Sequence, residues 1–252
     1  MAYRYVQLPS GRVAGMTGRG DPAAHHLAVL FHPTPGASGF DPDPTITSAS
    51  GVHMITFDRP GYGSSEPDDI TVNDWVDDIA AYLRRVKSTA SDTSAHTLYK
   101  QISMIGWREG GIFATALCAR HPDLTDKLVL VGVPEPSKAA RGQGDDTVHA
   151  FLGVGAEPPG YRDRVQRMLD DAHVQGDTGV TIDRRAFEDT GLQELSAATE
   201  ALVLYGKMDP YATTTDAHFY GSRLPNGKLR SASNGGDLIT AEWGHVLDYL
   251  HS

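Results

Sequence analysis

The sequence predicts an α/β protein with a mostly parallel sheet covered by helices on both faces. Short aliphatic and β-branched runs alternate with longer amphipathic stretches, which is the pattern of such a sheet. Between residues 135 and 199 this rhythm stops, and pieces rich in Pro and Gly alternate with helical ones, which indicates a helical lid inserted after a strand. We therefore expect a core formed by residues 1–134 and 200–252, and a lid formed by residues 135–199.

The first expected element is a hairpin. Residues 3–8 and 12–16 flank the turn-forming tripeptide Pro-Ser-Gly, so the first two strands should be antiparallel. Further apolar runs are bounded by Gly, Pro or Asp and are too short for helices. They are the expected buried strands, at residues 27–32, 53–57, 102–105, 127–133 and 201–205.

Three helices are expected between or after these strands. Residues 71–87 place apolar side chains on one helical face, with Thr71 and Asp74 at the spacing of a capping box. Residues 112–120 are almost wholly apolar and end before a proline, which disfavours helix in the residue preceding it. Residues 161–174 supply the clearest helical pattern of the lid.

Composition excludes several classes of function. The 252 residues include 22 Lys and Arg against 32 Asp and Glu, so the net charge is −10, and nucleic acid is not an expected partner. No apolar run approaches the roughly 18 residues of a membrane helix, so no membrane partner is expected either. The opening residues lack an apolar signal core and the only cysteine is Cys118, which favours a cytoplasmic location. We expect a small-molecule substrate, and a homo-oligomer remains open.

No cofactor or metal is expected. No spaced set of His, Cys and Asp has the pattern of a metal site, and no Gly-rich dinucleotide fingerprint follows the first strands.

Five segments place polar or glycine-rich residues where strands end. Residues 27–31 lead into HPTPG, and residues 53–57 lead into DRPGYGSSEP. Residues 102–111, ISMIGWREGG, read as a strand, a tight turn and a helix, which is the shape of a nucleophile elbow. Residues 202–209, LVLYGKMD, end in an acid, and ASNGGDL at 232–238 precedes the last helix.

In this order, the five segments make the chain resemble the α/β-hydrolase superfamily, in particular its small serine esterase, lipase and peroxidase-like members. The resemblance covers about residues 3–250, and FDRPGYGSS is its strongest single match. It implies an α/β-hydrolase fold with an eight-stranded sheet and a helical lid after the sixth strand. Because one fold hosts many activities, function must be argued from the site.

The resemblance also implies a catalytic triad, from which the sequence departs at two positions. The nucleophile position holds Arg108 and the histidine position holds Asp237, so only the acid, Asp209, is kept. A guanidinium offers no lone pair at neutral pH, and Arg108 therefore cannot be a nucleophile. A carboxylate with an ordinary pKa of about 4 is a poor substitute for imidazole. We expect no ordinary serine-hydrolase mechanism.

The family's oxyanion hole would here use the backbone N–H groups of Glu109 and Thr34. Pro33 replaces the usual glycine of that turn and removes an N–H. The neighbouring His32 could supply an imidazole, although in the resembled family this histidine mostly braces the turn.

Aromatic residues complete the candidate site. Trp107 should pack beside the elbow, and Tyr62 ends the DRPGYG turn near the cleft, where simple packing is the favoured interpretation. Tyr161 belongs to the expected lid, as does Phe151, and both are candidates for lining a pocket.

The residues leave two interpretations of Arg108 open. It either binds an oxyanion or carboxylate of the substrate, or it pairs with Asp209 or Asp237 and fills the space of the triad. Asp237 is correspondingly either a general base or a counter-ion.

Three functions follow. The first is an enzyme performing cofactor-independent, non-hydrolytic chemistry (cyclisation, elimination or isomerisation) on a small carbonyl-containing metabolite. Arg108 would hold negative charge, Asp237 would move the proton and Asp209 would orient them. The second is a non-catalytic protein that binds a ligand or partner. The third is a hydrolase that uses water activated directly by Asp237 or His32.

Overall fold

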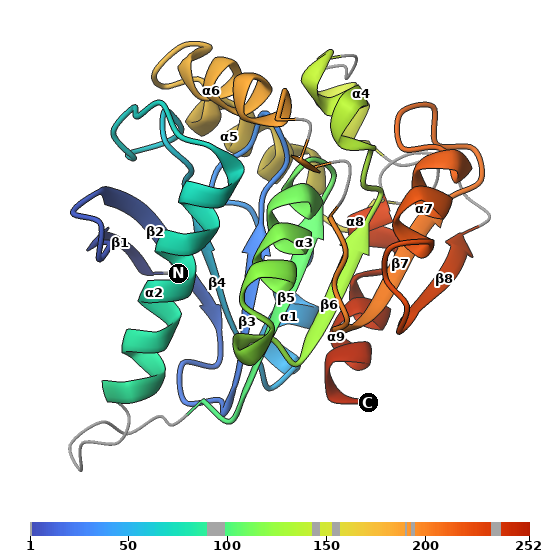
Figure 1. The fold of residues 1–252 in the computed structure, drawn as a ribbon, viewed down its shortest axis with the longest axis horizontal. Helices are drawn as coiled ribbons and strands as arrows, with labels where there is room; N and C mark the ends of the chain where they lie inside the picture. The colour runs from blue at the N-terminus through green and yellow to red at the C-terminus, as the bar shows by residue number, and fades with distance from the viewer. Residues whose placement is uncertain are drawn as a thin grey trace.

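A single eight-stranded sheet forms the centre of the protein (Figure 1). The computed structural model describes residues 2–89, 99–142, 147–152, 157–189, 191–192, 195–232 and 238–252. The strand order is β1-β2-β4-β3-β5-β6-β7-β8. Their bounds are β1 Ala2–Gln7, β2 Val13–Gly20, β3 His26–Phe31, β4 His53–Phe57, β5 Gln101–Trp107, β6 Lys127–Val131, β7 Glu200–Gly206 and β8 Gly227–Ala232.

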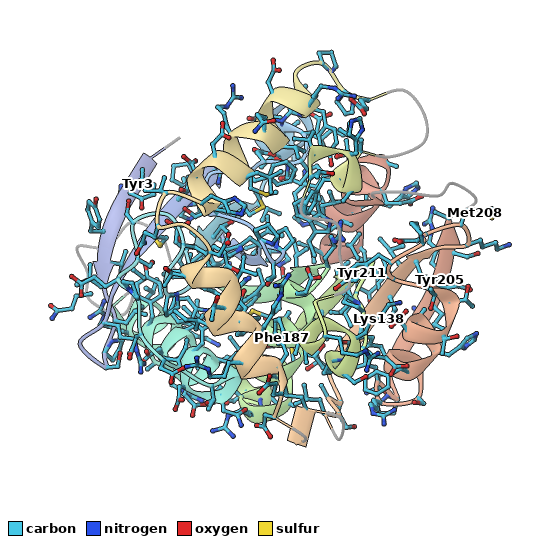
Figure 2. The ribbon with its side chains drawn as sticks, turned by 90° about the horizontal axis from the view of Figure 1, so that it is seen from above. Tyr3, Lys138, Phe187, Tyr205, Met208 and Tyr211 are labelled. Carbon is cyan, nitrogen blue, oxygen red and sulfur yellow. The ribbon has the colours of Figure 1, made fainter. Side chains whose placement is uncertain are left out.

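The sheet is parallel from β4 to β8, while β2 pairs antiparallel with both β1 and β4. The predicted hairpin and mostly parallel sheet are therefore confirmed. Strand β1 forms one edge, from which Tyr3 projects (Figure 2).

Helices cover both faces of the sheet (Figure 1). Helices α2 (Val72–Thr89) and α3 (Gly110–Arg120) pack on each other and on one face, near which α7 (Thr214–Gly221) contacts β7 and β8. Helix α9 (Trp243–His251) packs on the other face, with α1 (Pro44–Ala49) and α8 (Leu238–Ala241) in contact with it. No described helix is long and apolar enough to cross a membrane.

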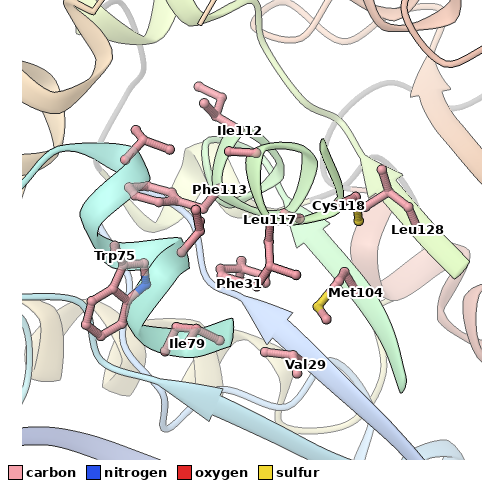
Figure 3. Packing of buried hydrophobic residues seen from close by; sticks show 14 of the residues in the cluster. Val29, Phe31, Trp75, Ile79, Met104, Ile112, Phe113, Leu117, Cys118 and Leu128 are labelled. Atoms are coloured by element: carbon pink, nitrogen blue, oxygen red, sulfur yellow. The ribbon is translucent and has the colours of Figure 1, made fainter. Parts of the chain in front are cut away.

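Successive side chains of the buried strands point to opposite faces of the sheet, so the core has two parts, one on each face. Val29 and Phe31 pack with α2 and α3, whereas Ala28 and Leu30 belong to the cluster around α9. This follows from the two-residue period of strand side chains. Figure 3 shows the first cluster, in which Phe113 and Leu117 of α3 lie near Phe31.

The described residues between β6 and β7 include α4 (Pro136–Ala140), η2 (Val148–Phe151), α5 (Tyr161–Ala172) and α6 (Thr178–Phe187), which we call the helical insertion. Figure 1 shows α4, α5 and α6 together at the top of the view, beyond the carboxyl ends of the parallel strands. Whether this segment acts as a lid stays a prediction.

Several predicted boundaries were wrong. Strand β2 continues past residue 16 to Gly20, because Met16 to Gly20 pair residue by residue with β4. Helix α3 begins at Gly110 rather than at residue 112, and α5 ends at Ala172 rather than at 174. Glycine is a weak helix former, so sequence propensity placed the start of α3 too late.

Candidate functional site

The candidate site lies where the direction of strand order reverses. Strand β3 pairs with β4 on one side and with β5, the next strand along the chain after β4, on the other side. In open α/β sheets such a switch point opens a crevice at the carboxyl ends of the strands. The turn after β3 carries Thr34, the turn after β5 carries Arg108 and Glu109, and the loop after β7 carries Asp209.

The elbow after β5 has the expected strained geometry. Arg108 has φ of 50°, and it is the one non-glycine residue with positive φ in the described part of the chain. A Cβ atom on Gly106 would lie 2.3 Å from the Cα of Gly111, so glycine is needed where strand and helix pass each other. A positive φ at a non-glycine residue is costly and is typical of functional or formerly functional turns.

The Arg108 side chain is held between two aromatic rings. Its guanidinium carbon lies 4.5 Å from the ring centroid of Phe151 and 4.6 Å from that of Tyr211. One terminal nitrogen, Nη1, donates to the carbonyl of Ala150 at 3.0 Å. The residue is 8% exposed, and its Nε is buried with no hydrogen-bond partner among the described residues.

This environment tests the pairing of Arg108 with Asp209, whereas a pairing with Asp237 falls outside the described residues. No described carboxylate, Asp209 included, lies within ion-pair distance of its guanidinium. The side chain instead joins the elbow to η2 of the helical insertion, and its Nε–H has no acceptor within the described part of the chain. Such a donor is costly unless a ligand or another group accepts from it.

The oxyanion turn differs from the expectation. The Thr34 amide donates to Oε2 of Glu109 at 3.1 Å, and Oε1 of Glu109 accepts a hydrogen bond from the Tyr211 hydroxyl. The Thr34 donor is therefore already occupied by a carboxylate of the protein. The Glu109 amide, in contrast, donates to no acceptor within the described ranges.

His32 is a bracing residue and cannot act as a base in this arrangement. Its Nδ1 donates to the Pro33 carbonyl at 2.8 Å, and its Nε2 accepts from the amide of Arg59 at 3.3 Å. Burial, with the Arg59 charge as a second cause, lowers the pKa of His32 well below its usual value. The imidazole is neutral and has no free lone pair.

A buried ion pair fixes the same turn to the insertion. The guanidinium of Arg59 is 2.6 Å from a carboxylate oxygen of Asp183 on α6, and both side chains are almost wholly buried. Arg59 also donates to the carbonyls of His32 and Pro33 and to Oγ1 of Thr34. Thr34 Oγ1 in turn donates to Asp183 at 2.6 Å.

The three aromatic candidates are structural in the described residues. Tyr62 is fully buried and donates to Asp183 at 2.8 Å, in keeping with the favoured interpretation of simple packing. The Tyr161 hydroxyl donates to the carbonyl of Phe151, and its ring is buried, so it does not line an open pocket. Trp107 stacks on Phe40 at 4.8 Å, as expected for a residue packed beside the elbow.

Asp209 is held by its own loop. Its Oδ1 accepts from the amides of Tyr211 at 2.8 Å and Ala212 at 3.0 Å. Burial raises the pKa of Asp209; the two amides and the charges of Arg108 and Lys138 act in the opposite direction. The other predicted acid, Asp237, lies outside the described residues, and so does the rest of its turn. Within the described ranges no group of three or more His, Cys, Asp or Glu could hold a metal ion.

Sequence reasoning missed Tyr211 and Lys138. Burial raises the pKa of Tyr211 strongly, with the Glu109 charge as a second cause, so the hydroxyl stays protonated and donates. Lys138 of α4 donates to the Tyr211 carbonyl and to Asp216, and its Nζ lies 5.5 Å from the Tyr211 ring centroid (Figure 2). The position of Tyr211 two residues after Asp209 was the available signal. Nothing local marks Lys138.

Comparisons with known proteins agree with this architecture. No family model matches the chain. Human serine hydrolase BPHL is 29% identical over 116 residues, which are 46% of this chain and 37% of that protein. A pimeloyl-[acyl-carrier protein] methyl ester esterase from Shewanella woodyi is 33% identical over 105 residues, 42% of this chain and 34% of the relative. The chain thus spans about a third of the length of the curated relatives it matches.

Solved structures match along the whole chain. An esterase from Exiguobacterium antarcticum has a TM-score of 0.76 at 16% identity and covers 100% of both chains. An enol-lactonase from Burkholderia xenovorans has a TM-score of 0.73 at 16% identity over 98% of both chains. A bromoperoxidase from Bacillus anthracis has a TM-score of 0.72 at 14% identity over 99% of both chains. The chain has the α/β-hydrolase fold.

Proposed function

We propose that the protein is an α/β-hydrolase-fold enzyme that performs cofactor-independent, non-hydrolytic chemistry on a small carbonyl-containing metabolite. The observation that carries this proposal is the buried guanidinium of Arg108 at the elbow, with an N–H of Nε left without an acceptor among the described residues. A buried cation with a donor that has no acceptor among the described residues suits a developing enolate or a carboxylate. A cytoplasmic location and a possible homo-oligomer stay predictions.

Three features argue against acyl transfer through a covalent intermediate. Arg108 has no lone pair with which to attack a carbonyl. The imidazole of His32 is neutral, and both of its nitrogens are engaged. In the resting protein the Thr34 amide, half of the oxyanion hole implied by the fold, is occupied by Glu109. An esterase needs all three of these functions at once.

Proton transfer at a carbon next to a carbonyl needs fewer catalytic groups than acyl transfer does. A carboxylate takes the proton, the C–H electron pair forms a C=C bond, and the π electrons of the carbonyl move onto its oxygen to give an enolate; the proton then returns at another atom, or the enolate expels a leaving group. Asp209 suits the proton-carrying role because burial raises its pKa, and its Oδ2 accepts no hydrogen bond from the described residues. Arg108 would donate to the enolate oxygen. Asp237 is a second candidate for the proton transfer.

Solvent-deuterium exchange tests this proposal without knowledge of the product. The protein is incubated in D₂O with a panel of 2-oxo acids, β-keto acids and enol lactones, and NMR follows loss of the C–H signal next to the carbonyl. We expect exchange with at least one compound, and a loss of about 100-fold or more in Asp209→Asn and in Arg108→Gln, because general acid–base catalysis contributes about 10²–10⁴-fold.

The matched control is Asp123→Asn, which changes an exposed carboxylate paired with Arg84 and should leave exchange unchanged. Exchange that is unaffected by both site variants would contradict the proposal.

A second candidate is a non-catalytic protein that binds a small ligand in the former active site. It is favoured by the internal hydrogen bonding of the oxyanion turn, where both the amide and the hydroxyl of Thr34 already have partners in the protein. This candidate predicts saturable binding of a panel compound with no exchange and no product.

A third candidate is a hydrolase that activates water directly, suggested by the names of the esterase and lactonase relatives. It predicts release of a chromogenic alcohol from short esters. That activity would be abolished by Asp237→Asn.

A further inference from the structure

The Glu109 carboxylate makes contacts that a bound ligand would make. Its two oxygens accept hydrogen bonds from the Thr34 amide and the Tyr211 hydroxyl, and the residue is 3% exposed. The two donors come from loops after different strands, β3 and β7. They converge on a carboxylate that belongs to neither loop.

Both donors are fixed independently of Glu109. Thr34 is held through its hydroxyl, which donates to Asp183 and accepts from Arg59. The Tyr211 backbone is held at both ends, because its amide donates to Asp209 and its carbonyl accepts from Lys138. The donors should therefore stay in place when the Glu109 side chain leaves.

Two cationic side chains lie beside the Tyr211 ring, which carries one of the two donors. The Tyr211 ring has the guanidinium of Arg108 at 4.6 Å and Nζ of Lys138 at 5.5 Å. Among the described residues, the Glu109 side chain forms no ion pair, so the two hydrogen bonds are its anchors. A side chain held by two hydrogen bonds can be displaced by a ligand that makes the same two bonds and adds a further contact of its own.

We propose that the Thr34 amide and the Tyr211 hydroxyl form a carboxylate-binding subsite, which Glu109 fills in the resting protein and which the carboxylate of the substrate occupies once Glu109 swings out. This inference rests on the proposed function and narrows its substrate to a carbonyl compound that also carries a carboxylate. Glu109 is then an internal competitor that keeps the site closed until an anionic ligand arrives.

Chemical rescue tests the subsite without knowledge of the substrate. Glu109→Ala deletes two carbons and two oxygens, which is the heavy-atom content of acetate. Acetate should enter the space and accept from Thr34 and Tyr211. For so small a ligand we expect a dissociation constant on the order of 10 mM. About 100 mM acetate should then raise the folding equilibrium constant of Glu109→Ala about elevenfold, a factor of 1 + [L]/Kd.

The measurement is urea unfolding in sodium acetate against sodium chloride at equal ionic strength. Glu200→Ala is the matched control, because it also deletes a glutamate bound to a tyrosine hydroxyl, Tyr249, but on the exposed surface. It should show no acetate effect. Glu109→Gln keeps the subsite filled and should not respond either. Adding Tyr211→Phe to Glu109→Ala should remove most of the response while keeping the ring beside Arg108.

Each outcome decides the proposal. An acetate effect confined to Glu109→Ala supports it, and an equal effect in the controls or none in Glu109→Ala overturns it. If Glu109→Ala is insoluble in chloride, recovery of folded protein in acetate supports the subsite and failure to recover contradicts it. Because the readout is stability, deuterium exchange without an acetate effect would overturn the subsite alone. Acetate binding without exchange would instead overturn the enzymatic function alone.

Discussion

Removing one partner of the buried ion pair between Arg59 and Asp183 should cost more stability than removing one partner of any exposed ion pair among the described residues. Asp183→Asn removes the negative charge but keeps the size of the side chain. It leaves the guanidinium of Arg59 buried, with only neutral acceptors such as the carbonyls of His32 and Pro33. Breaking a buried pair from one side costs about 3–5 kcal/mol. The remaining carbonyl acceptors place the expected loss near the lower end, at about 3 kcal/mol.

The assay is urea unfolding at pH 7, followed by circular dichroism and tryptophan fluorescence. With a urea dependence of about 1–3 kcal/mol per molar, the midpoint should fall by about 1 M or more. Asp69→Asn is the matched control, because Asp69 pairs with Arg185 of the same helix α6 while both side chains are largely exposed. That change should lower stability by less than about 1 kcal/mol. A loss in Asp183→Asn no larger than in Asp69→Asn would refute the reasoning.

Three further predictions concern the elbow and buried titratable groups. Arg108→Gly should be more stable than Arg108→Ala by about 1 kcal/mol, because φ at this position is 50°, and urea unfolding that ranks them in the opposite order would contradict this. Burial raises the pKa of Cys118 to about 12, so the thiol should resist Ellman's reagent at pH 8 until the protein unfolds, and rapid reaction of the native protein would be the opposing result. Burial lowers the pKa of His26 from 6.5 to about 4, so the unfolded chain binds the proton more readily and stability should fall as pH decreases from about 6.5 to 4. His26→Gln should flatten that part of the stability profile, and an unchanged profile would show that His26 does not cause it.

Local signals in the sequence predicted most of the fold. Short apolar runs at strand positions and the elbow glycines are properties of a few neighbouring residues, so they can be read without tertiary information. The C-terminal part of β2, after residue 16, was missed because its glycines, Gly18 and Gly20, are typical of a loop. These residues form a strand through pairing with β4. Pairing with a neighbouring strand can stabilise a strand conformation that local propensity does not predict.

The candidate site was only partly predictable. Strand-end motifs located Thr34, Arg108 and Asp209 at one edge of the sheet, but they did not say which side chains meet there. Asp183 reaches Thr34 from 149 positions away, and no local pattern marks that contact. The occupation of the Thr34 amide by Glu109 depends on one side-chain conformation, which the sequence does not encode locally.

Labelling with a fluorophosphonate, read by intact-protein mass spectrometry, tests most directly whether covalent acyl chemistry is closed to this protein. An active serine esterase treated in parallel should gain one adduct per chain. We predict no added mass on the native protein, because a guanidinium stands at the elbow and both ring nitrogens of His32, the imidazole of the oxyanion turn, are engaged. A stoichiometric adduct on a hydroxyl of this cleft would contradict the account.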